Sequence, residues 1–170
     1  RLKHEGANVI VADSGHVVAY MGDDERFDYL YKFVSAGKYR EGDRTHNMTL
    51  LSAGNLYVAR FTGNSPLEEI TGAGNVPADG SFDGTGEWLP LVVDGASAVP
   101  GMTLEEVLVY TRLAADKVGP TKMDRCEDVE PSLLTGKVYV ACTNNSDRGK
   151  VGKEGATEIN PRNANRDGHI

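Results

Sequence analysis

Two segments that lie far apart in the chain follow the same plan. In each, a carboxylate precedes a strand, a tight turn at glycine and a second strand, which ends in a pair of oxygen-bearing side chains. Glu5 and Gly15 belong to the first segment, which ends in an Asp-Asp pair, whereas Glu127 and Gly136 belong to the second, which ends in an Asn-Asn pair. Because each repeated unit brings a carboxylate to an equivalent position, the repetition predicts a shared polar centre. Convergent oxygens of this kind hold hard cations.

Four strand candidates follow one another in the first half of the chain. They are residues 17–21, 29–35, 55–61 and 87–93, each bounded by Gly, Asp or Asn. Their Val, Tyr, Phe and Leu content and partial alternation are typical of strands. Four antiparallel strands over about one repeat length indicate a propeller blade. We therefore expect a mainly β fold that is part of a β-propeller with four-stranded antiparallel blades.

One helix is predicted to interrupt the strands near residues 103–117. Thr103 and Glu106 have the spacing of a capping box, in which each side chain bonds the backbone amide of the other residue. The expected apolar face is formed by Leu104, Val107, Leu108 and Leu113. The end of the chain, residues 143–170, is rich in Asn, Gly, Arg and Asp, and we expect it to form loops that carry function.

Length, charge and hydrophobicity limit the kinds of domain and partner that are compatible with this chain. With 170 residues and 25% charged residues, the chain is long enough for one domain. Its net charge of −7 argues against a nucleic-acid partner, which needs a basic face. No run of 18 apolar residues is present, so we expect no membrane span.

The two ends of the chain look cut. It opens on Arg1 without a methionine and stops at Ile170 without a tail. We therefore expect residues 1–170 to be an internal fragment of a longer protein and a partial domain. Open sheet edges and blade faces would favour self-association of such a fragment.

Two cysteines leave several interpretations open. Cys142 alternates within an apolar strand and is expected to be a small core residue. Cys126 lies among charged residues and is a ligand, a free thiol or half of a bridge to Cys142. No spacing typical of a zinc site occurs.

The charged segment around Arg125 has two interpretations. In a strand, Arg125 and Glu127 share a face, because residues i and i+2 do so. A guanidinium beside metal-bound carboxylates would suit a phosphate. The alternative is a structural Arg–Glu pair, with Glu5 and Glu127 as solvated carboxylates. The Asp and Asn pairs described above are likewise compatible with ordinary turns.

Several blocks of the chain resemble the PhoX-type alkaline phosphatases, nearly end to end and in order. They are residues 4–7, 20–35, 56–61, 121–125, 143–145 and 160–170. The resemblance implies a β-propeller phosphatase that is exported in folded form through a twin-arginine signal, so that it is periplasmic or secreted. It also implies Fe3+ and Ca2+ as cofactors and a phosphate monoester as substrate.

By resemblance, Glu5 and Glu127 fall at positions that bind metal, and Arg125 falls at a position that contacts phosphate. The family usually has proline where this chain has Cys126. The family's iron-binding cysteine belongs to a segment before Arg1, and further acidic ligands belong to a segment after Ile170. The chain would thus carry only part of the site, and we expect the isolated fragment to be inactive.

Two other functions are compatible with the same strands and acidic turns. One is a calcium-binding propeller module that binds a partner without catalysis, and the other is a propeller lactonase or esterase. Arg125, placed two residues before Glu127, favours phosphate as the substrate. No residue resembles a nucleophile activated by a neighbouring base, which is consistent with a nucleophile supplied at a metal centre.

Overall fold

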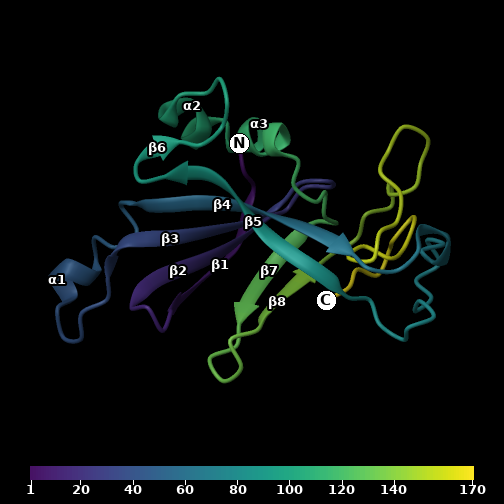
Figure 1. The fold of residues 1–170 in the computed structure, drawn as a ribbon, viewed down its shortest axis with the longest axis horizontal. Helices are drawn as coiled ribbons and strands as arrows, with labels where there is room; N and C mark the ends of the chain where they lie inside the picture. Colours follow the sequence, from purple (N-terminus) through teal and green to yellow (C-terminus); the bar gives the residue numbers. More distant parts are fainter.

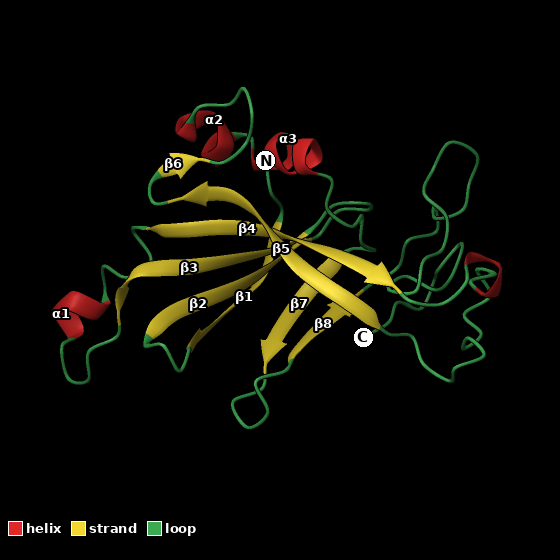
Figure 2. Ribbon diagram, viewed as in Figure 1, coloured by secondary structure: helices red, strands yellow, loops and turns green.

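The computed structural model describes residues 1–170, and its largest feature is an antiparallel sheet in which each strand pairs with its neighbour in the sequence (Figures 1 and 2). Its strand order is β1-β2-β3-β4-β5-β6, and β7 and β8 form a separate two-stranded sheet. The elements in chain order are β1 (His4–Val11), β2 (His16–Asp23), β3 (Leu30–Lys38), α1 (Arg44–Asn47), β4 (Gly54–Gly63), η1 (Leu67–Glu69), β5 (Gly84–Val93), β6 (Ala96–Ser97), α2 (Leu104–Val109), α3 (Thr111–Val118), β7 (Cys126–Pro131) and β8 (Val138–Cys142).

The four predicted strands are present and lie side by side as β2 to β5. The mainly β, antiparallel character of the fold is therefore confirmed. The sheet has six strands rather than four, because β1 adds to one edge and the two-residue β6 adds to the other. The arrangement of such sheets as propeller blades stays a prediction.

The prediction of a single helix near residues 103–117 is wrong in one respect, because the segment forms two helices. The capping box is present, since the Thr103 hydroxyl accepts from the Glu106 amide and the Glu106 carboxylate accepts from the Thr103 amide. The break lies at Tyr110, whose φ of −112° and ψ of 46° leave the helical region. The second helix then ends at Gly119, which has a φ of 72° and is the kind of left-handed cap that favours glycine.

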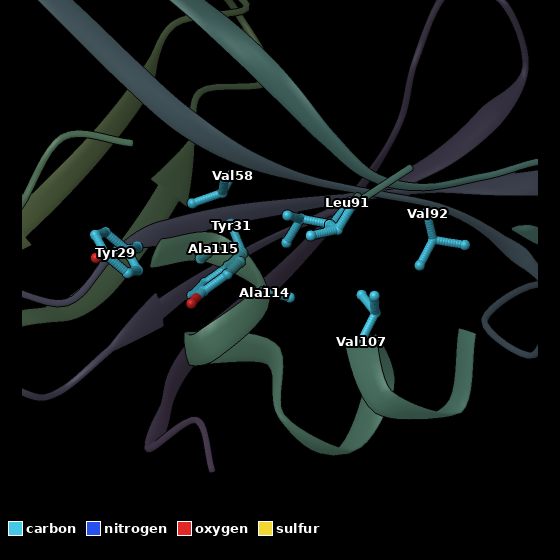
Figure 3. Close-up of a cluster of buried hydrophobic side chains, with 9 residues drawn as sticks. Tyr29, Tyr31, Val58, Leu91, Val92, Val107, Ala114 and Ala115 are labelled. Atoms are coloured by element: carbon cyan, nitrogen blue, oxygen red, sulfur yellow. The ribbon is translucent and has the colours of Figure 1, made fainter. Parts of the chain in front are cut away.

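The main core lies between the central strands and these two helices (Figure 3). Tyr31 and Val58 of the sheet and Val107, Ala114 and Ala115 of the helices are fully buried there. The predicted apolar face is only partly correct, because Leu108 and Leu113 point to solvent and are 57% and 58% exposed. Small alanines take their place, which lets the second helix lie close to the sheet.

Both predicted hairpins are present, as β1–β2 and β7–β8, and they pack against each other. Two glycines permit the contact. A Cβ atom added at Gly22 would lie 2.2 Å from the carbonyl oxygen of Cys126, and one added at Gly6 would lie 2.8 Å from the backbone of Asp128. Only glycine lets the two backbones approach this closely.

The final segment, residues 143–170, is loop, as predicted, and it runs beside the β7–β8 hairpin. Isolated bridges join Cys142 to His169 and Asn145 to Asn165. No helix in the structure is both long and apolar enough to cross a bilayer.

Candidate functional site

Arg125 stands at the centre of a polar cluster where the two hairpins meet. Its Nη2 atom lies 2.7 Å from Oδ1 and 3.0 Å from Oδ2 of Asp24, and 3.0 Å from Oε1 of Glu127. Its Nη1 atom donates to Oδ1 of Asn144 over 3.2 Å. The end of β2, the start of β7 and the residues after β8 therefore converge on one guanidinium. The Arg125–Glu127 ion pair, which was the structural alternative to a phosphate-binding role, is present in the structure; the assignments of Arg125 to phosphate and Glu127 to metal stay predictions.

A β-bulge sets the position of Glu127. The β7–β8 register shifts between Cys126 and Asp128, so that Glu127 is the extra residue. Its carboxylate accepts from the Thr143 hydroxyl over 2.7 Å and is 37% exposed. The bulge thus places one half-buried carboxylate beside Arg125, with its second oxygen available to another partner.

Asp24 contributes a carboxylate oxygen that can still accept a hydrogen bond or bind a cation. Its Oδ1 atom is buried and has no well-aligned hydrogen-bond donor, although the Arg125 charge is close. The positive charge of Arg125, whose Nη2 atom is 2.7 Å away, offsets part of the cost of burying this oxygen. The side-chain oxygens of Asp24, Glu127 and Asn144 are of the kind that act as ligands to hard cations such as calcium or ferric ions.

Glu5 does not join this cluster in the structure. It lies on β1 opposite Gly22, and its side chain is exposed. The carboxylates whose oxygens do come together, within 4.8 Å of one another, are those of Asp79 and Asp83, between β4 and β5, and of Glu158, in the loop segment after β8. Hydrogen bonds from Ser65 lower the pKa of Glu158. That Glu5 and Glu127 share one metal centre stays a prediction.

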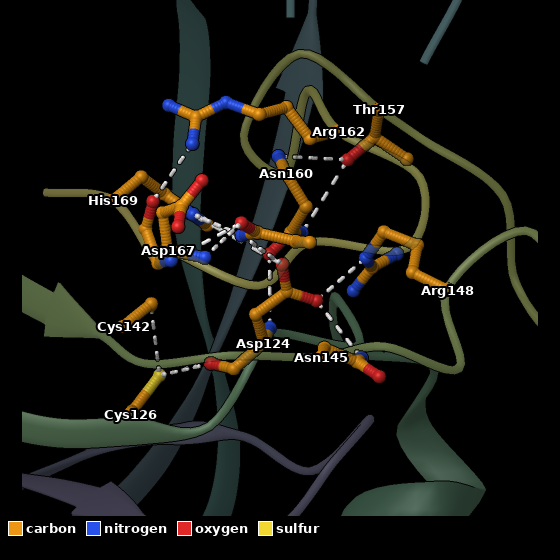
Figure 4. Close-up of polar contacts among 12 residues, drawn as sticks. Asp124, Cys126, Cys142, Asn145, Arg148, Thr157, Asn160, Arg162, Asp167 and His169 are labelled. Atoms are coloured by element: carbon orange, nitrogen blue, oxygen red, sulfur yellow. Dashed lines mark hydrogen bonds and ion pairs between the residues drawn. The ribbon is translucent and has the colours of Figure 1, made fainter. Parts of the chain in front are cut away.

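A second, buried network surrounds Asp124, the residue before Arg125, and was missed by the sequence analysis (Figure 4). Asp124 is fully buried and accepts from Nε of Arg148 over 2.6 Å. It also accepts from the side-chain amides of Asn145 and Asn165, over 2.9 and 3.1 Å. Its own backbone amide donates to Oδ1 of Asn160 over 2.9 Å. This network attaches the final loop segment to the residue that precedes Arg125.

The only sequence signal for that network is indirect. Asn is frequent in residues 143–170, and an Asp stands next to Arg125. Neither pattern indicates which Asn faces which carboxylate, because the partners are 21 to 41 residues apart.

Asp23, the neighbour of Asp24, has a structural role. It is fully buried and accepts from Nε of Arg112 over 2.7 Å and from the backbone amide of Lys3 over 3.0 Å. Burial, together with the negative charge of Asp23, raises the pKa of nearby Asp28 to about 6. The two neighbouring carboxylates at the end of β2 therefore have different partners: Asp23 binds Arg112 of α3, and Asp24 binds Arg125.

The two cysteines face each other from the two strands of the β7–β8 hairpin. Both are buried free thiols, and their sulfur atoms lie 3.7 Å apart. Their mutual hydrogen bond and burial raise the pKa of Cys126, whereas the same contact lowers the pKa of Cys142. Cys142 is thus a core residue, as predicted, and Cys126 is one as well.

Comparison with known proteins points to one family. The family model described as alkaline phosphatase PhoX matches residues 1–170. A solved structure, Pseudomonas fluorescens PhoX in complex with vanadate, a transition state analogue, is 38% identical to this chain, with a TM-score of 0.78. The match covers 97% of this chain and 27% of that protein, so the chain spans about a quarter of its relative. No curated protein matches the chain.

Proposed function

Because the chain belongs to the PhoX alkaline phosphatase family, we propose that it supplies part of the active site of a phosphomonoesterase. The observation that carries the proposal is the convergence of Asp24, Glu127 and Asn144 on Arg125. A guanidinium and several hard oxygens in one place suit an anionic substrate held together with cations. The relative that binds vanadate supports a phosphate-like ligand for this fold.

Glu127 is assigned to metal, and the residues around it fit that role. The cluster brings the carboxylates of Asp24 and Glu127 together beside Arg125, and the Glu127 carboxylate is partly exposed. Glu5 is assigned to the same metal centre from β1, which packs against β7. We propose Fe3+ and Ca2+ as the cofactors. When bound, they would supply positive charge and Lewis acidity against a phosphate dianion.

Arg125 is assigned to the phosphate. Its guanidinium presents a rigid fork of N–H donors, which matches two oxygens of a phosphoryl group. Asn144 and Asp24 hold the plane of that fork, since both accept from it. As charge builds on the equatorial oxygens, donors that are already in place stabilise it without reorganisation. Arg125 would thus act on the transition state more than on the free substrate.

Residues 1–170 are proposed to be an internal part of a longer propeller enzyme that works in the periplasm or outside the cell. The 27% coverage of the P. fluorescens protein supports this. Antiparallel strands that pair in chain order are compatible with blades. The remaining ligands of the metal centre would come from other parts of the longer protein.

The proposal is tested by metal analysis and a phosphomonoesterase assay on the full-length protein. We expect bound iron and calcium, turnover of p-nitrophenyl phosphate, inhibition by vanadate and loss of activity after chelation. Calcium binding without turnover of any ester would indicate the partner-binding module instead. Turnover of lactones that is indifferent to iron would indicate the lactonase.

A further inference from the structure

Cys126 and Cys142 occupy directly opposed positions on β7 and β8. They are paired residues in the antiparallel register, and their sulfur atoms are 3.7 Å apart. Cys126 is fully buried and Cys142 is 5% exposed. No other cysteine occurs in the chain. Each thiol therefore has one sulfur partner within reach.

The backbone pairing of Cys126 with Cys142 is of the type that suits a cross-strand bridge. Both backbone groups of Cys142 bond to His169, which lies on the other side from β7. Cys142 therefore exchanges no backbone hydrogen bond with Cys126. In such non-hydrogen-bonded pairs the Cα atoms are about 4.5 Å apart, with the side chains close together. Disulfides require Cα atoms roughly 4.4 to 6.8 Å apart, a range that includes the usual spacing of such pairs.

The pair also lies at the point where the two strands support the polar cluster. Cys126 separates Arg125 from Glu127, and Cys142 directly precedes Thr143. The Thr143 amide donates to the Arg125 carbonyl over 2.9 Å, and the Thr143 hydroxyl donates to Glu127 over 2.7 Å. Figure 4 shows the two cysteines near Asp124. A covalent link here would fix the spacing of the residues that position the guanidinium.

We propose that Cys126 and Cys142 form a disulfide that clamps β7 to β8 under oxidising conditions. The oxidant is a low-molecular-weight disulfide such as oxidised glutathione. The two protein thiols lose two protons and two electrons as one S–S bond forms. The S–S bond of glutathione is broken in exchange, and two molecules of reduced glutathione are released. Formation of this bridge can be tested whether or not the protein is a phosphatase.

Peptide mapping of the full-length protein tests the bridge directly. The protein is treated with oxidised glutathione, its remaining thiols are blocked, and it is digested with trypsin. Cleavage after Arg125, Lys137 and Arg148 separates the two cysteines onto peptides 126–137 and 138–148. We expect these peptides to be joined, with a mass two hydrogens below their sum, and to separate on reduction.

Two further measurements distinguish the bridge from simple thiol oxidation. In Cys126→Ser, Cys142 has no partner, so the same treatment should give only a mixed disulfide or a free thiol. The oxidised wild type should melt at least about 2 °C above the reduced form, because a cross-link restricts the unfolded chain, whereas Cys126→Ser should show no such rise. Wild-type peptides that carry blocked thiols, or glutathione on each cysteine, would overturn the inference.

Discussion

The Nη2 atom of Arg125 lies 2.7 Å from Oδ1 of Asp24, although the two residues are 101 positions apart in the sequence. This contact joins the end of the first hairpin to the start of the second. It depends on Gly22, because any side chain there would collide with the carbonyl of Cys126. The close packing of two backbones therefore determines where the guanidinium lies.

Glu127→Gln in the full-length protein should lower bound metal and phosphatase activity together. The neutral amide keeps the shape of the side chain but removes the charge that offsets a cation. We expect activity to fall at least about tenfold. Elemental analysis and turnover measured on the same preparations provide the test. Glu130→Gln, an exposed change on the same strand, is the matched control and should alter neither.

Asp124→Ala should destabilise the protein by about 3–5 kcal/mol, because it leaves the buried Arg148 guanidinium without its carboxylate. Urea unfolding measures the change. Asp167→Ala removes an exposed carboxylate from the same loop segment and should have little effect. Equal stability of the two variants would show that the Asp124 network contributes little to folding.

Asp28 should make stability depend on pH in an unusual direction. Its pKa is raised from 3.8 to about 6 in the folded protein, so between these values the folded state binds more protons than the unfolded state. Stability from this group is therefore present below pH 4 and is lost as the pH rises to about 6. Asp28→Asn should be more stable than wild type by about 1–2 kcal/mol at pH 7.5, and the difference should vanish near pH 4. A constant difference across that range would contradict the assignment.

The isolated segment 1–170 should bind iron poorly and hydrolyse phosphate esters negligibly, since the chain spans 27% of its PhoX relative. Assays of the purified segment beside the full-length protein check this. Robust turnover by the segment alone, in a preparation free of other phosphatases, would show that the whole site lies within these residues.

Local sequence patterns predicted the two hairpins but not every break and contact around them. Alternating apolar residues and the turn glycines Gly15 and Gly136 indicate both hairpins, because these patterns are local. The two-residue spacing of Arg125 and Glu127 suggested their contact, but the β-bulge that positions Glu127 was not predictable from that spacing. The break at Tyr110 was not predictable from helix periodicity, which continues through that residue.

The buried networks lie outside what local patterns can show. Asp124 is bonded by residues 21 to 41 positions away, and these pairings exist only after the final loop folds over β8. The convergence of Asp79, Asp83 and Glu158 likewise depends on the path of two loops. Tertiary packing, rather than periodicity, determines both sets of contacts.

Arg125 is proposed to contact the phosphate while other residues hold the metal. Vanadate inhibition of full-length Arg125→Lys, measured with metal content on the same preparations, tests it most directly. Arg60→Lys, which changes a surface arginine paired with Glu87, is the control. We expect normal metal content, weaker vanadate inhibition and a loss of about 2–4 kcal/mol of transition-state stabilisation, because lysine offers a point charge in place of a planar fork. Full activity with unchanged vanadate inhibition would show that Arg125 is structural and would contradict the account.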